Sequence, residues 1–240
     1  MIEDFKPVII CGARGGGTSF FSKFLRANTF YAGESIEVGR ADVKHLGYLG
    51  KAKWHESKLI SEAITKPILQ HIGIDHNKLV NPSVGPEKYV EAKKILDSIS
   101  PSYWENVVKE NIKDMTAIFK QEFPYDKAIY GWKDPRNVYL LPFWKYLFPK
   151  ATFVTVERNM NPNPSNIGSE GKNFTAWGND NAFRDLYYTH YDDFRFQFED
   201  FDKVDKVNEL LSFLKLKTLD DSKLRAQLKE LKFMYSKIGK

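Results

Sequence analysis

The sequence predicts an α/β fold with three layers: a mainly parallel five-stranded sheet, a P-loop-like glycine loop and an inserted helical cap. Two observations favour this fold. Short apolar runs alternate with longer segments of helical periodicity. The first apolar run, 8–11, also leads directly into a glycine-rich loop that opens a helix. With 240 residues, of which 42% are hydrophobic, the chain can bury the core of one domain, expected to span 1–240.

The glycine-rich loop is the most informative stretch of the chain. Four glycines occur between positions 12 and 17, and two hydroxyl residues follow at the start of the expected helix. Glycines let the backbone approach an anion, and a helix start offers free N–H groups and a positive dipole. A flexible turn is the alternative, but a turn rarely needs three consecutive glycines and two hydroxyls. The pattern predicts a phosphate-like ligand bound by Arg14, Gly15, Gly16, Gly17, Thr18 and Ser19.

The loop differs from a nucleoside-triphosphate loop at one position. Such loops carry a lysine after the last glycine, which reaches the β- and γ-phosphates, whereas this chain has Thr18 there. The cation of the loop is Arg14 instead. The loop therefore suits a single phosphate-like group better than a triphosphate.

The remaining elements are expected from apolar patterns and from turn residues. Four more strands are expected at 28–32, 128–132, 152–156 and 194–198. Helices are expected at 138–148, 204–214 and 221–236, and several within an inserted cap at about 54–123. One cap helix should begin at a capping box formed by Ser102 and Glu105. The segments 40–53 and 159–178 are expected to be loops.

Polar side chains follow the expected strands where each strand ends. The stretch Lys133-Asp134-Pro135-Arg136 follows one strand, and Arg158 follows the next. Because the carboxyl ends of parallel strands meet at one edge of a sheet, these groups should lie beside the glycine loop. Two separate cationic positions suit a ligand with two separate phosphates.

In order along the chain, several segments resemble the sulfotransferase family, whose enzymes use 3′-phosphoadenosine-5′-phosphosulfate (PAPS). These segments are 12–18, 131–136, 141–144, 148–151, 153–158 and 196–201. The resemblance implies that the glycine loop holds the 5′-phosphosulfate, with Arg14 as its cation. It also implies that Arg158 binds the 3′-phosphate together with Ser165, for which Asn166 and Ser169 are alternatives.

A second resemblance concerns the catalytic base. The stretch Tyr31-Ala32-Gly33-Glu34-Ser35 is similar to the Gly-Glu element of protein-tyrosine sulfotransferases, whose glutamate acts as the base. The resemblance implies that Glu34 is the base, with Glu37 and His45 in reserve; a solvated loop carboxylate is the alternative. Arg14 and Lys133 are expected to stabilise the charge that builds on the leaving phosphate. No metal ion is expected.

The predicted function is sulfuryl transfer from PAPS to a hydroxyl or amine of a small molecule or glycan, leaving 3′,5′-bisphosphoadenosine. One alternative is a nucleotide kinase on the same loop architecture. Another is a non-catalytic binder of anionic polymers. The acceptor and the oligomeric state stay open.

Charge and cysteine content limit the possible partners and compartments. The net charge is +5, which favours an anionic ligand, but no basic tract of the kind that binds nucleic acid occurs. The single cysteine, Cys11, excludes a disulfide within the chain and suits a reducing compartment. No apolar run approaches the ~18 residues of a membrane span. A cytoplasmic protein without a nucleic-acid partner is expected.

Overall fold

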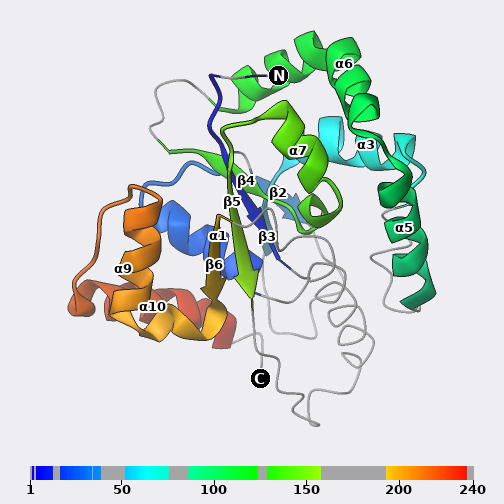
Figure 1. The fold of residues 1–240 in the computed structure, drawn as a ribbon. Helices are drawn as coiled ribbons and strands as arrows, with labels where there is room; N and C mark the ends of the chain where they lie inside the picture. Colours follow the sequence, from blue (N-terminus) through cyan, green and yellow to red (C-terminus); the bar gives the residue numbers. More distant parts are fainter. Residues whose placement is uncertain are drawn as a thin grey trace.

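The computed structural model describes residues 2, 4–12, 17–33, 35–38, 52–75, 86–123, 129–157 and 193–236 (Figure 1). Its centre is a parallel four-stranded sheet in the order β4-β1-β5-β6. The strands are β1 (Val8–Cys11), β4 (Gly131–Lys133), β5 (Thr152–Glu157) and β6 (Phe194–Gln197). The predicted parallel sheet is confirmed, with four strands rather than five among the residues that the structure describes.

The missing strand is the one expected at 28–32. Its place is taken by a single parallel bridge between Tyr31 and Tyr130. Thr29 and Gly33 have φ values of 70° and 67°, so left-handed residues bracket the segment. Because extended backbone cannot continue through such residues, only a short piece remains to pair with the sheet.

A second sheet was not predicted from the sequence. It is an antiparallel pair formed by β2 (Ser35–Val38) and β3 (Ala52–Ser57), in which Glu37 is opposite Lys53. The expected loop at 40–53 therefore ends in a strand, and the helical part of the cap begins at Lys58 rather than at 54. Pairing between segments this far apart leaves little local signal in the sequence.

The cap contains helices α2 (Lys58–Ile60), α3 (Lys66–His71), α5 (Pro86–Ser98) and α6 (Pro101–Glu122). A π-helical turn, Ser61–Thr65, joins α2 to α3. Helix α6 is capped by Ser100, whose hydroxyl accepts a hydrogen bond from the backbone N–H of Tyr103 at 3.2 Å. The predicted capping box at Ser102 is therefore wrong. Pro101 can occupy the first helical position because that N–H has no partner within the helix.

The other helices in the described part of the chain are α1 (Thr18–Ala27), α7 (Leu141–Leu147), α9 (Val204–Phe213) and α10 (Asp221–Ser236). The helix expected at 138–148 is divided into a 3₁₀ turn, Pro135–Tyr139, and α7. Pro142 accounts for the division, because it lacks the N–H that a continuous helix would need there. Another 3₁₀ turn, Phe198–Asp202, follows β6. No helix among the described residues is long and apolar enough to cross a membrane.

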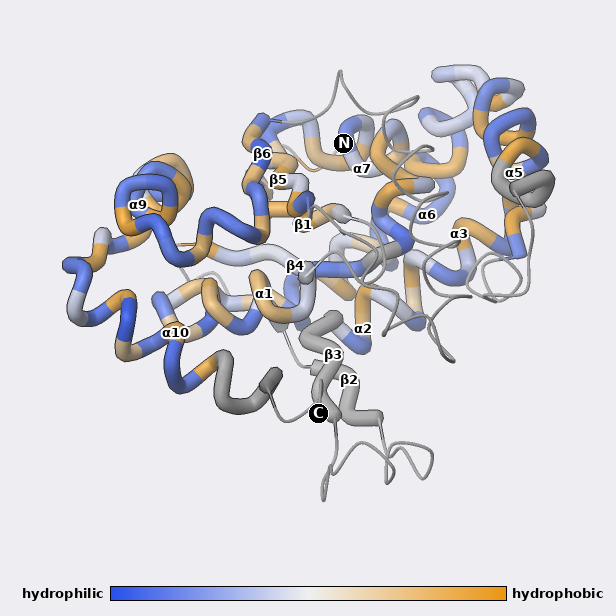
Figure 2. Tube along the Cα trace, turned by 90° about the horizontal axis from the view of Figure 1, so that it is seen from below, coloured by the Kyte–Doolittle hydropathy of each residue, from blue (hydrophilic) through white to orange (hydrophobic). Residues whose placement is uncertain are grey.

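The sheet separates two hydrophobic cores. Figure 2 shows β1, β5 and β6 between α6 and α7 on one side and α1 and α10 on the other. The core toward α6 and α7 includes Phe119, Trp132, Trp144, Phe148 and Phe153. The core toward α1, α9 and α10 includes Phe21, Phe24, Phe196, Phe201 and Leu211. Helices therefore cover both faces of the sheet, and its strand ends are left as the place for a site.

Candidate functional site

The carboxyl ends of β1, β4 and β5 meet at one edge of the sheet. Ile10 of β1 is paired with Lys133 of β4 on one side and with Val154 of β5 on the other. Lys133 is therefore level with Ile10, which lies two positions before Gly12, the first residue of the glycine loop. The chain leaves β5 at Glu157 along the same edge. The expected meeting of strand ends is confirmed for β1, β4 and β5.

Two glycines bracket the loop, and each lies where a side chain would not fit. A Cβ atom at Gly12 would lie 2.6 Å from the carbonyl oxygen of Val156. A Cβ atom at Gly17, where φ is +90°, would lie 2.6 Å from the Cε2 atom of Phe198. The loop therefore leaves β1 in contact with β5 and enters α1 in contact with the residue that follows β6.

The positive end of the helix dipole at the start of α1 is not offset by a capping or acidic side chain of its first turn. Gly17 is the N-cap residue, so it has no side chain with which to cap the first turn, and no acidic residue lies in that turn. Thr18 is buried at the first helical position, and Ser19 follows it. Backbone N–H groups and hydroxyls at a helix start are a common arrangement for binding an anion.

Most of the other predicted site residues lie outside the described part of the chain. These are Arg14, Gly15, Gly16, Glu34, His45, Arg158, Ser165, Asn166 and Ser169. Glu37 is described only through the backbone of β2. The structure thus brings together Gly17, Thr18, Ser19 and Lys133 at one sheet edge, and the roles of all the site residues stay predictions.

The last residue of β4 and the turn that follows it carry a cluster of buried charged side chains. Lys133, Asp134 and Arg136 are 3%, 1% and 7% exposed. The guanidinium of Arg136 donates from Nε to Asp134 Oδ1 and from Nη2 to Oδ2, each at 2.7 Å. Nη2 of Arg136 also donates to the hydroxyl of Ser61 in the cap. Asp134 therefore neutralises Arg136, and Lys133 brings the net charge of the three residues to +1.

Three further hydrogen bonds fix the turn after β4, and none of them was predicted from the sequence. The side-chain amide of Asn137 donates to the carbonyl oxygen of Ile10 at 3.2 Å, and the indole N–H of Trp132 donates to Asn137 Oδ1 at the same distance. Asp134 caps the 3₁₀ turn by accepting from the N–H of Arg136 at 2.9 Å. An aspartate followed by proline was a visible signal for this cap, whereas the contact to β1 left none.

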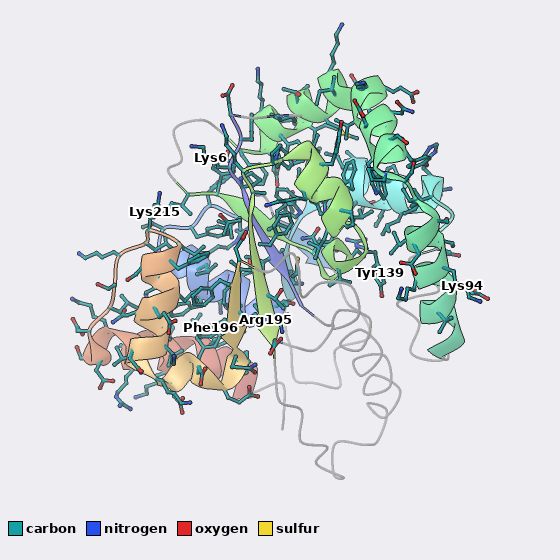
Figure 3. The ribbon with its side chains drawn as sticks, viewed as in Figure 1. Lys6, Lys94, Tyr139, Arg195, Phe196 and Lys215 are labelled. Atoms are coloured by element: carbon teal, nitrogen blue, oxygen red, sulfur yellow. The ribbon has the colours of Figure 1, made fainter. Side chains whose placement is uncertain are left out.

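Glu157 ends β5 in contact with two residues of β6. Gln197 Nε2 donates to Glu157 Oε2, and Arg195 Nη1 lies 3.3 Å from Oε1. Figure 3 shows Arg195 and its neighbour Phe196 at β6. The residue that precedes Arg158 is thus held by the neighbouring strand. Among the described residues, no group of three or more His, Cys, Asp or Glu side chains is placed to hold a metal ion.

No protein-family model and no curated protein sequence matches the chain. Among solved structures, it is similar to the sulfotransferase STF1 from Mycobacterium tuberculosis H37Rv, in its type 1 form. The identity is 14%, the match covers 93% of this chain and 70% of that chain, and the TM-score is 0.40. Similarity at this level assigns no family to the chain.

Proposed function

We propose that this protein is a sulfotransferase that uses PAPS as its donor and a hydroxyl or amine of a small molecule or glycan as its acceptor. One observation carries the proposal. The start of α1, the end of β4 with Lys133, and the end of β5 before Arg158 share one sheet edge. A donor with a 5′-phosphosulfate and a separate 3′-phosphate needs cations and N–H donors at two such places.

The proposed reaction is an in-line displacement at sulfur. The acceptor oxygen or nitrogen forms a bond to sulfur while the bond from sulfur to the 5′-phosphate oxygen breaks, and the electron pair stays on that oxygen. The acceptor proton passes to a base, for which Glu34 is the candidate. Lys133 supports this chemistry because a buried cation at the strand end would stabilise the negative charge that develops on the leaving oxygen.

The choice of cofactor is tested by paired thermal melts. We expect 3′,5′-bisphosphoadenosine to stabilise the protein without magnesium, because the loop has Thr18 where a triphosphate loop has lysine. A ligand at 100 times its dissociation constant adds about 2.7 kcal/mol of stability, which raises the melting temperature by a few degrees. ATP with magnesium, at the same concentration, should raise it less.

The two alternatives give different melts. A larger shift with magnesium-ATP than with bisphosphoadenosine would support a nucleotide kinase and contradict the sulfotransferase. No shift with either nucleotide would support a non-catalytic binder of anionic polymers. Release of bisphosphoadenosine from PAPS, followed by chromatography, then tests transfer itself.

Arg158 is proposed to bind the 3′-phosphate, and its replacement tests that role. We expect Arg158→Ala to weaken bisphosphoadenosine binding by about 2–5 kcal/mol, the cost of removing one partner of a buried charge contact. Binding of adenosine 5′-phosphate, which lacks the 3′ group, should change little. Titration calorimetry with both nucleotides measures the difference.

The control for this substitution is Arg195→Ala. Arg195 is an arginine of β6, its side chain is 40% exposed, and it pairs with Glu157. Its replacement should leave both affinities nearly unchanged. An equal loss of both nucleotides in Arg158→Ala would instead mean that Arg158 supports the fold.

A further inference from the structure

A single segment at the start of the cap, 57–61, makes two side-chain contacts, one with the turn after β4 and one with the end of α6. The first contact is the hydrogen bond that Ser61, in the π-helical turn, accepts from Arg136. Arg136 is paired through two hydrogen bonds with Asp134, which directly follows Lys133. The hydroxyl of Ser61 is therefore linked through Arg136 to Asp134, the residue next to Lys133, the candidate catalytic lysine.

The second contact comes from Ser57, four residues earlier. Its hydroxyl donates to Glu122 Oε1, a buried carboxylate at the end of α6, and accepts from the N–H of Ile60 at 3.1 Å. Glu122 in turn packs against Gly33. A Cβ atom at Gly33 would lie 2.7 Å from the Cδ atom of Glu122. Ser57 and Glu122 thus act on the turn that immediately precedes Glu34.

The turn at Gly33 is also held from its other side. Arg26, at the end of α1, donates through Nη2 to the carbonyl oxygens of Ala32, at 3.0 Å, and of Gly33. Burial lowers the pKa of Arg26, and the charges of Tyr31 and Glu122 act in the opposite direction. The backbone at Gly33 therefore lies between Arg26 and Glu122.

The two points of contact belong to neighbouring positions in the fold. The bridge between Tyr31 and Tyr130 aligns the segment that ends at Gly33 beside the one that ends at Lys133. The backbone confirms this alignment, because Gly131 N–H donates to the Tyr31 carbonyl oxygen at 3.0 Å. We name the five residues Ser57, Ser61, Glu122, Asp134 and Arg136 the cap seam.

Burying the charged side chains of the cap seam between the cap and the sheet costs free energy. Buried charges lose hydration, and well-packed apolar side chains often stabilise an interface equally well. The π-helical turn that carries Ser61 is also a rare element that occurs frequently at functional sites. Charged groups in such a place are better explained by the geometry that they impose than by the stability that they add.

We propose that the cap seam positions Lys133, through Asp134, and the backbone at Gly33, which directly precedes the candidate base Glu34. This inference rests on the proposed sulfotransferase function. Ser61 and Glu122 are then positioning residues, which act on the reaction without touching the substrate. Misplacing a catalytic group by about 1 Å can lower a rate about 100-fold, so even a single lost contact should be measurable.

The test compares Ser61→Ala and Glu122→Ala with two control variants. Turnover is measured as bisphosphoadenosine released from PAPS, with water as the acceptor. We expect both alanine variants to lower kcat at least about tenfold while the KM for PAPS and the melt shift with bisphosphoadenosine change less than about twofold. Glu122→Gln keeps an acceptor for Ser57 and should stay within about threefold of the wild-type kcat. Glu110→Ala, an exposed position on the same helix, should have no effect.

Each other outcome overturns the inference in a recognisable way. If both alanine variants turn over PAPS like the wild type, the cap seam positions nothing. If KM and nucleotide binding deteriorate together with kcat, its role is structural. If the wild type neither binds bisphosphoadenosine nor releases it from PAPS, the proposed function fails, and the inference fails with it.

Discussion

Arg136→Ala should lower the free energy of unfolding by about 3–5 kcal/mol, because it leaves the carboxylate of Asp134 buried without its partner. Asp134 is 1% exposed and accepts three hydrogen bonds from Arg136, two from the guanidinium and one from the backbone N–H. Alanine keeps only the backbone bond. The change also removes the donor to Ser61 in the cap. Urea denaturation, with a comparison of midpoints and slopes, measures this loss.

An exposed pair of the same kind provides the control. Arg225 donates from Nε to Asp221 at 2.6 Å, but the two side chains are 71% and 52% exposed. Arg225→Ala should leave the urea midpoint almost unchanged, since solvent already screens that pair. If Arg136→Ala were as mild as Arg225→Ala, the pair after β4 would not be the buried anchor that we describe.

Glu34→Gln should reduce the turnover of PAPS by about 10²–10⁴-fold, the usual cost of losing a general base. Glutamine has nearly the same shape but cannot take up the acceptor proton. Stabilisation by bisphosphoadenosine should be unaffected, because Glu34 is not proposed to bind the nucleotide. Steady-state turnover and thermal melts of the same variant separate the two effects.

The reserve candidates for the base provide the comparison. Glu37→Gln and His45→Ala should each retain turnover within about threefold of the wild type if Glu34 is the base. Near-normal turnover by Glu34→Gln, with a large loss in one of the other two variants, would reassign the base. Loss of nucleotide binding in Glu34→Gln would instead point to a role in the cofactor site.

The parts of the fold that were predicted correctly depend on local signals. The apolar run of β1 between Pro7 and Gly12 and the helical spacing of α9 and α10 are visible within about ten residues. The errors arose where distant contacts decided the structure. The hairpin of β2 and β3 depends on pairing across a long connection, and the strand at 28–32 is shortened by two left-handed residues.

In the candidate site too, features that follow from local signals were predicted, and features that depend on distant contacts were not. That Lys133 would lie near the glycine loop followed from the rule that parallel strands end at one edge. The partners of the strand-end residues could not be predicted. Ser61 and Arg136 are 75 positions apart, and Ser57 and Glu122 are 65 apart, so neither pair leaves a periodic pattern. Arg136, which the sequence placed only in a polar stretch after a strand, is paired with Asp134.

The division of the interior into two cores has a consequence for synthesis on the ribosome. Among the residues that the structure describes, every buried member of the core toward α6 and α7 lies at or before Phe153, so these residues can pack together while the rest of the chain is still being made. The core toward α1 extends to Leu231. The phenylalanines of α1 must therefore wait for β6, α9 and α10 to emerge. During that interval the nascent chain presents an uncovered aromatic surface, of the kind that chaperones bind.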